Sequence, residues 1–533
     1  MKSTDEANNM LNLSFDSLPV RVPTIRLWSR GVLSWDLRPF EFAVRRVDVG
    51  TEAVDRQRGT LRMSAGVRGV RIGTCQRARF KATGREVNVS PYCGIFRGST
   101  PTLRNGQSGV VDVAKCREET SMLDGKLSRR EAMQSLATVS ASFLMSKDTM
   151  GEEIQSSLPD VKITAVKTFR LRHQLKRPFG VSVSVPLDRQ RTALLVKIET
   201  DAGLVGWGET ADIGGALGAI KGQLGPRLIG KNPIAHRSNW RSLWGPNFGD
   251  GRAVGALDIA LNDLRGQILN VPVAELWGGR LRAHVPVYAS AMNYLEGEQP
   301  ETIFPREAVM LCEQGFRAMK MRIGRYDVRR EAAVIASVRD VVGPEIKLMA
   351  DGNAAYTMGT ALKMGRYLSE YDFEYFEEPL PQSPQYAGYE QLRRRLALPL
   401  AGGEAVDSRG AAKRLIDRGA FDIIQPDVSL CGGIGELLFI AELARLSGVR
   451  CLPHCWGGAI LIAATVHALA VMPDPHWGLP TDSPMLELDR SENPWRDEIA
   501  IEPIHLDGGR VRVPEKPGLG IHVVEEAVSR YAV

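Results

Sequence analysis

A row of charged side chains between residues 320 and 454 has the composition of a catalytic site. Its members stand at the ends of six successive apolar runs, and they are Lys320, Arg322, Asp351, Glu377, Glu404, Asp427 and His454. Carboxylates that converge on one point can bind a hard divalent cation such as Mg²⁺ through their oxygen atoms. A lysine on one side of that cation and a histidine on the other could transfer protons.

The spacing of this row predicts a barrel. The intervals from Lys320 to His454 are 31, 26, 27, 23 and 27 residues, and each matches one strand, one helix and two short connections. When such repeats close into a barrel, the carboxyl ends of the strands lie on one face, where the active sites of these barrels are found. We expect the first strand at residues 284–290, the second at 318–323 and the eighth at 476–479.

A smaller domain is expected before the barrel. Alternation of apolar and polar residues predicts antiparallel strands at 161–171, 192–200 and 204–209. Apolar residues at helical spacing predict helices at 216–224 and 253–269.

The predicted fold class is therefore α/β, a (β/α) TIM-type barrel with an α+β N-terminal capping domain. We place the cap at residues 161–280 and the barrel at 281–500. Residues 501–533 contain a hairpin turn and a helical end, and we expect them to pack back on the cap.

Residues 1–121 form a basic extension. They hold 20 Lys and Arg against 12 Asp and Glu, whereas the rest of the chain holds 48 against 50, so the formal net charge of +6 arises here. The segment has no sustained periodicity. It also lacks the interleaved aromatic residues of a nucleic-acid-binding module. We expect a disordered extension or an over-extended reading frame, and no nucleic-acid partner.

Residues 122–160 allow two interpretations. Arg129 and Arg130 precede a mildly apolar run at 137–145, a pattern similar to a twin-arginine export signal. In that case the chain would start at Met122 and the protein would be periplasmic. Alternatively, the segment is an amphipathic linker helix and the protein is cytoplasmic.

Cysteine content and hydropathy exclude two further classes. The seven cysteines form no paired CxxC pattern, so no disulfide framework is expected. Cys451 and Cys455 bracket His454, but the acids of the row favour a hard metal over a thiolate site. No apolar run reaches 18 residues, which argues against a membrane span.

From about Val161 to its end, the chain resembles the enolase superfamily, in its mandelate racemase and muconate lactonizing enzyme branch. The resemblance rests on motifs in matching order and spacing: Gly206-Trp-Gly-Glu209, Ala256–Asp263, Leu276–Gly279, Lys320-Met-Arg322, Ala350–Asn353, Phe376–Pro379, Gly402–Glu404, Gln425–Asp427 and Pro453-His454.

The resemblance implies a role for each of these residues. The implied Mg²⁺ ligands are Asp351, Glu377 and Glu404, with Asn353 contacting substrate or a water beside the metal. His454 would be a general base oriented by Asp427.

One position departs from the family pattern. The family's Lys-x-Lys motif reads Lys320-Met-Arg322 here. An arginine stays protonated, so it is a poor base but a good donor to a carboxylate. We therefore expect Lys320 and Arg322 to be electrophilic or orienting groups. Glu487 lies in the segment Pro484-Met-Leu-Glu-Leu-Asp489, which resembles the acid-sugar lactone cycloisomerases and dehydratases of the branch. It could donate to the enediolate, or it is a surface acid.

A single base with Mg²⁺ fits removal of the proton α to a carboxylate, followed by loss of water or opening of a lactone ring, in a sugar-derived acid. The alternatives are a racemase or epimerase of a hydroxy acid and a non-catalytic binding protein on the same fold. The expected partner is a small-molecule carboxylate, and we expect a homo-oligomer without membrane contact.

Overall fold

The computed structural model describes residues 159–533, apart from 246–248, 475–482 and 503, together with the backbone of six short strands between residues 11 and 88. The chain divides into two compact units, Met1–Glu152 and Glu153–Val533. The expected disorder of residues 1–121, apart from these strands, and the twin-arginine pattern at Arg129 and Arg130 lie outside the described residues.

The first unit contains two small antiparallel sheets. One has the order β1 (Leu11–Leu13), β2 (Ile25–Leu27), β3 (Leu33–Leu37) and β4 (Phe40–Ala43), and the other pairs β5 (Arg79–Ala82) with β6 (Arg85–Asn88). These strands were not predicted, because strands of three to five residues are too short to show a sustained alternation.

The capping domain is built on an antiparallel sheet of four strands. Its order is β11 (Tyr294–Leu295), β7 (Ile163–Gly180), β8 (Asp188–Thr200) and β9 (Val205–Thr210), so the three predicted strands are present and a fourth comes from within the barrel sequence. Helix α5 (Gly251–Leu269) packs closely on β9, since a Cβ at Gly208 would lie 1.9 Å from the Ala256 carbonyl oxygen.

Shorter helices complete the cap. They are α2 (Ala216–Ala219), a π-helical turn (Ile220–Leu224), α3 (Gly225–Leu228), α4 (His236–Trp244) and α6 (Val273–Leu276). The helix predicted at 216–224 is present, but its second half is π-helical, and the helical run continues through α3.

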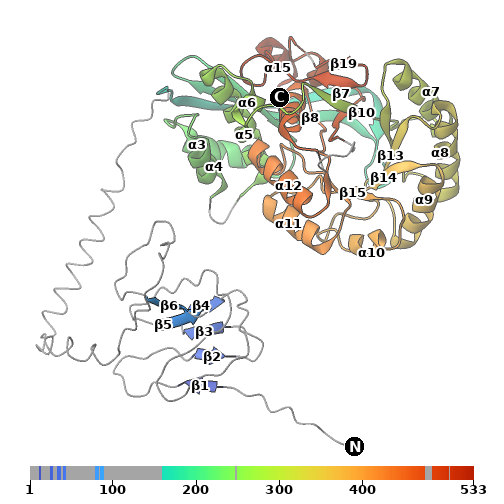
Figure 1. Ribbon diagram of the computed structural model, residues 1–533. Coiled ribbons are helices and arrows are strands. Elements are labelled where there is room, and N and C mark those ends of the chain that lie inside the picture. The colour runs from blue at the N-terminus through green and yellow to red at the C-terminus, as the bar shows by residue number, and fades with distance from the viewer. Residues whose placement is uncertain are drawn as a thin grey trace, which may run out of the picture. The chain divides into compact units, whose positions relative to one another are not determined.

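Among the described residues, eight parallel strands form the barrel, and the last of them pairs with the first. They are β10 (His284–Ala291), β12 (Ala318–Arg322), β13 (Lys347–Asp351), β14 (Phe373–Glu377), β15 (Leu400–Gly402), β16 (Ile423–Ile424), β17 (Arg450–Cys451) and β18 (Leu486–Asp489). Helices follow the strands on the outside (Figure 1). They are α7 (Pro300–Glu313), α8 (Val328–Val342), α9 (Met358–Glu370), α10 (Tyr389–Arg393), α11 (Arg409–Arg418), α12 (Ile434–Leu446), α13 (Ala459–Val471) and α14 (Pro494–Asp497).

The predicted position of the eighth strand is wrong. The strand that pairs with β10 is β18, ten residues after the predicted start at His476, and residues 476–479 lie outside the described part. The aromatic and apolar run His476–Leu479 resembled a strand. The real strand alternates Leu486 and Leu488 with two acids that are also buried, so it reads as too polar for a core strand.

The C-terminal segment joins the barrel to the cap. The hairpin of β19 (Leu506–Asp507) and β20 (Arg510–Arg512) pairs with β10, and after α15 (Glu525–Tyr531) Ala532 pairs with Leu171 of β7. The C-terminus accordingly lies beside β7 and β8 (Figure 1). His467 of α13 adds a buried link, because its Nδ1 accepts from the Ala274 amide of α6 and its Nε2 donates to the Leu519 carbonyl.

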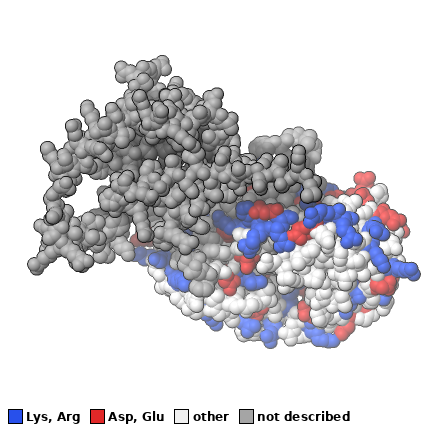
Figure 2. All heavy atoms as spheres, turned by 90° about the horizontal axis from the view of Figure 1, so that it is seen from below, with Lys and Arg blue, Asp and Glu red and all other residues white. Residues whose placement is uncertain are grey.

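The surface of the described part is mixed in charge. Lys and Arg side chains lie interspersed with Asp and Glu on the face shown in Figure 2. Across the described residues, every helix is too short or too polar to cross a bilayer.

Candidate active site

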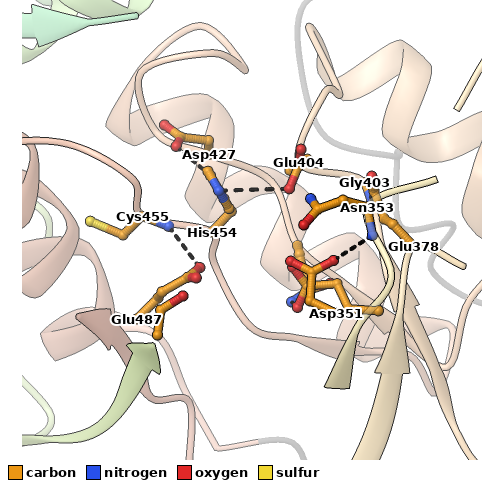
Figure 3. A network of polar contacts seen from close by, with 12 residues as sticks. Asp351, Asn353, Glu378, Gly403, Glu404, Asp427, His454, Cys455 and Glu487 are labelled. Carbon is orange, nitrogen blue, oxygen red and sulfur yellow. Dashed lines mark hydrogen bonds and ion pairs between the residues drawn. The ribbon is translucent and has the colours of Figure 1, made fainter. Parts of the chain in front are cut away.

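The carboxyl ends of the barrel strands bring the predicted residues together. Arg322 and Asp351 are paired neighbours at the ends of β12 and β13, and Asp351 is in turn paired with Glu377 at the end of β14. The remaining members are Lys320 in β12, Glu487 in β18, and Glu404, Asp427 and His454 in the loops after β15, β16 and β17. Figure 3 shows the side chains of Asp351, Glu404, Asp427, His454 and Glu487 around one space.

His454 is oriented by two carboxylates. Its Nδ1 lies 2.8 Å from Asp427 Oδ2, and its Nε2 lies 3.6 Å from Glu404 Oε2 (Figure 3). Asp427 is itself fixed, because its Oδ1 accepts from the amide and the hydroxyl of Ser429, each at 2.7 Å. Burial opposes the charged imidazolium, but Glu404 and Asp427 outweigh it and raise the pKa of His454 to about 10.

Lys320 is buried among three carboxylates. Its Nζ lies 2.7 Å from Glu377 Oε1, 2.7 Å from Glu487 Oε1 and 3.7 Å from Asp351 Oδ2. Burial disfavours the ammonium, yet these charges raise the pKa of Lys320 well above its ordinary value. These contacts favour the protonated form of Lys320.

Arg322 is held at the end of β12 by three polar contacts. Its guanidinium pairs with Asp351 Oδ2 and donates to Asn353 Oδ1 at 3.1 Å and to Ser290 Oγ at 3.2 Å. Asn353 is fixed in turn, because its backbone amide donates to Asp351 Oδ1 at 2.9 Å. The sequence indicated Asn353 and Arg322 for this site, and their contacts place them side by side.

Two further residues belong to this network. Gln425 donates to Glu377 Oε2 at 2.7 Å, and Glu378 accepts from the Tyr386 hydroxyl and the Gly403 amide, each at 3.0 Å. Burial, followed by the Glu404 charge, raises the pKa of Glu378 well above its ordinary value. The motifs around Glu377 and Asp427 contain both residues, but nothing in the motifs assigned them a contact.

The charge of the site is unbalanced in a way that suits a divalent cation. Five carboxylates surround three cationic groups. They are Asp351, Glu377, Glu404, Asp427 and Glu487 around Lys320, Arg322 and His454. Except for Glu404, these carboxylates are almost fully buried, and buried charges need compensation by protons or cations.

The side chains do not enclose a metal as they stand. Within the described ranges, no three His, Cys, Asp or Glu side chains form a metal-binding group. Asp351 and Glu377 instead direct oxygens to Arg322 and Lys320. The donor types and the excess negative charge fit Mg²⁺, and the assignment of Asp351, Glu377 and Glu404 as its ligands stays a prediction.

A loop of the cap covers one side of the site. The β7–β8 hairpin loop (residues 181–187) lies against the loops after β12 and β13. The Val183 amide donates to the Gly324 carbonyl at 3.0 Å. The Ser182 hydroxyl donates to the Asn353 carbonyl at 3.0 Å, and the Ser184 hydroxyl donates to the Ala354 carbonyl at 2.9 Å. The cap therefore contributes to the wall beside Arg322 and Asn353.

Comparison with known proteins agrees with this geometry. The N-terminal domain model of mandelate racemase and muconate lactonizing enzyme matches residues 163–278, and the enolase C-terminal domain-like model matches residues 304–527. The chain belongs to the enolase superfamily. This enolase-superfamily chain is 36% identical to the D-galactarolactone cycloisomerase of Agrobacterium fabrum, over 70% of its own length and 99% of that protein.

More distant relatives within the superfamily carry out related reactions. The arabinonate dehydratase of Saccharolobus solfataricus is 30% identical, over 63% of this chain and 89% of that protein. A solved racemase from Streptomyces coelicolor with bound magnesium is 26% identical, with a TM-score of 0.61, over 70% of this chain and all of that one. The protein is thus an enolase-superfamily enzyme, a lyase or an isomerase.

Proposed function

We propose that the protein removes the proton α to the carboxylate, or to the lactone carbonyl, of a sugar-derived acid, and that the resulting enediolate loses water or opens its ring. The observation that carries this proposal is that the site has one imidazole fixed by a carboxylate, whereas Lys320 and Arg322 hold their protons against carboxylates. The relatives that are cycloisomerases and dehydratases support the reaction class.

His454 acts as the base through Nε2. Asp427 accepts the Nδ1 hydrogen at 2.8 Å, so the neutral ring carries its lone pair on Nε2, the nitrogen near Glu404. After proton transfer, the imidazolium is stabilised by both carboxylates and can return the proton to the leaving hydroxyl or ring oxygen.

Asp351, Glu377 and Glu404 would hold Mg²⁺. When bound, the cation would stabilise the negative charge of the enediolate and offset the Glu404 charge that contributes to the raised pKa of His454. The chain's own cations have separate tasks: Arg322 and Asn353 orient the substrate carboxylate beside the cap loop, and Lys320 balances Glu377 and Glu487.

Glu487 is best suited to a supporting role. It is fully buried, and Lys320, His454 and Arg322 hold its pKa well below its ordinary value despite burial. A carboxylate that stays ionised accepts hydrogen bonds and does not donate them. The expected donation from Glu487 to the enediolate therefore requires prior protonation, so we assign it the task of fixing Lys320 and the Cys455 amide.

A screen of acid sugars and their lactones with Mg²⁺ tests the proposal. We expect a deoxy-keto acid or a ring-opened acid as product, and loss of activity when EDTA removes the metal. In D₂O, one deuterium should enter the product. Deuterium in recovered substrate with inverted configuration would instead establish the racemase alternative. Absence of turnover and of deuterium exchange with every acid sugar would refute the proposal.

A further inference from the structure

The indole ring of Trp456, two residues after His454, is in contact with two guanidinium groups. The Arg191 Cζ is 4.9 Å from the centre of the indole, and the Arg322 Cζ is 5.1 Å from it. Arg191 comes from β8 of the cap and Arg322 from β12 of the barrel. Two cations are thus brought to one ring from two domains, and each contact between a guanidinium and an indole is attractive.

Each of the two arginines also forms an ion pair with an aspartate. Arg191 pairs with Oδ2 of Asp489, the last residue of β18, at 2.7 Å, and it donates to the hydroxyl of Ser491 just after that strand at 2.7 Å. Arg322 pairs with Asp351. A continuous row of contacts therefore runs from Asp489 through Arg191, Trp456 and Arg322 to Asp351.

The indole is one of several contacts that hold the Arg322 guanidinium. The Arg322 Nε–H is buried and, among the residues that the structure describes, has no acceptor. Its terminal nitrogens contact Asp351, Asn353 and Ser290, and the Trp456 ring lies against its face. Phe179, in β7 two residues before the hairpin loop, adds a ring contact to Trp456 with centres 6.5 Å apart. The Trp456 side chain therefore contacts both Arg322 and the strand that leads into the hairpin loop.

We propose that Trp456 is a positioning residue that couples the seating of the β7–β8 hairpin loop to the orientation of Arg322. This rests on the proposed function, in which Arg322 binds the substrate carboxylate. Loss of the indole lets the guanidinium rotate away from the substrate and loosens the hairpin. The consequence is weaker substrate binding, with the proton transfer by His454 little changed.

Four variants test the coupling: Trp456→Leu, Trp456→Phe, Arg191→Gln and the double variant Trp456→Leu with Arg191→Gln. We expect Trp456→Leu to raise KM roughly tenfold, with kcat within about threefold, since loss of two cation–π contacts is on the order of a tenfold effect. Trp456→Phe should restore most of the affinity. The double variant should be no worse than the more affected single variant, because both changes break the same row.

A second readout does not need substrate. Hydrogen–deuterium exchange of peptides covering residues 181–187 should be faster in Trp456→Leu and in Arg191→Gln than in the unmodified protein. Phe439→Leu is the matched control, because Phe439 contacts Arg409 at 4.2 Å on the outer helix α12 and is 45% exposed. It should change neither KM nor exchange at the hairpin.

The outcomes separate the coupling from the reaction. If no acid sugar is turned over but exchange at 181–187 rises in both single variants, the proposed function fails and the coupling of Trp456 to the hairpin stands. Unchanged exchange in both variants overturns the coupling, whatever the activity. An unchanged KM in Trp456→Leu, or additive effects in the double variant, also overturns it.

Discussion

Replacing Asp427 by asparagine should remove the basicity of His454 while leaving its ring in place. The Asp427 carboxylate accepts from His454 Nδ1 through Oδ2 and from Ser429 through Oδ1. An amide cannot satisfy both sides. If its oxygen stays with Ser429, its NH₂ faces Nδ1, and the neutral ring must carry its hydrogen on Nε2, where no lone pair is left to accept a proton.

The reverse amide orientation keeps the productive tautomer but turns the NH₂ toward the Ser429 amide. That leaves a buried donor without an acceptor, at a cost of about 1–3 kcal/mol. The variant also lacks the negative charge of Asp427, which stabilises the positively charged imidazolium. We therefore expect kcat to fall roughly 10²–10³-fold, which corresponds to about 3–4 kcal/mol of barrier.

The assay is exchange of the α-hydrogen of an acid-sugar substrate in D₂O, followed by NMR. Asp422→Asn is the matched control, because Asp422 pairs with Arg393 just before β16, at its opposite end from Asp427. It should exchange at the rate of the unmodified protein. A rate for Asp427→Asn within about threefold of the unmodified protein would refute the assignment of His454 as base.

Three further predictions concern stability. Burial lowers the pKa of His467 from 6.5 to about 4, so protonation of this ring disfavours the folded state. The free energy of unfolding should be greatest above pH 6.5 and fall by about 3 kcal/mol as the pH drops to 4. Urea unfolding of His467→Gln should lack this pH dependence. Gly208→Ala should cost about 3 kcal/mol by forcing β9 from α5, whereas Gly218→Ala, with nothing within 4 Å of its Cβ, should not destabilise the protein; equal melting temperatures would contradict this. Lys320→Met should cost about 3–5 kcal/mol by leaving carboxylates unpaired, and a melting temperature unchanged at pH 7 would disprove that role.

The sequence best predicted those site residues that lie next to a strand end in the chain. In a parallel barrel each strand end is close in sequence to the side chain it presents, so the interval pattern from Lys320 to His454 was enough to predict one shared face. The eighth strand was misplaced because a short strand with two inward acids lacks an apolar signal. Glu487 was nevertheless indicated, because the resemblance to the family extends to the segment Pro484-Met-Leu-Glu-Leu-Asp489 and does not depend on strand periodicity.

Contacts between distant segments could not be predicted in this way. The proton-holding role of Lys320 depends on Glu377 and Glu487, which come from two other strands. Likewise, nothing local to Trp456 indicates that arginines from the cap and from β12 meet on its ring. Such pairings are set by tertiary packing, which no spacing rule within one element reports.

The loop that carries His454 illustrates how the cap sets the position of the base. Glu209, at the end of the cap's Gly-Trp-Gly-Glu motif, accepts from the amides of Gly458 and Leu461 at the start of α13. A Cβ at Gly457 would lie 3.0 Å from Glu209 Oε1, and one at Gly458 would lie 3.1 Å from the same atom. Gly457-Gly458 therefore permits a close approach that lets a cap carboxylate cap a barrel helix. Since this contact begins four residues after His454, the cap is tied to the loop that carries the proposed base as well as to the wall beside Arg322 and Asn353.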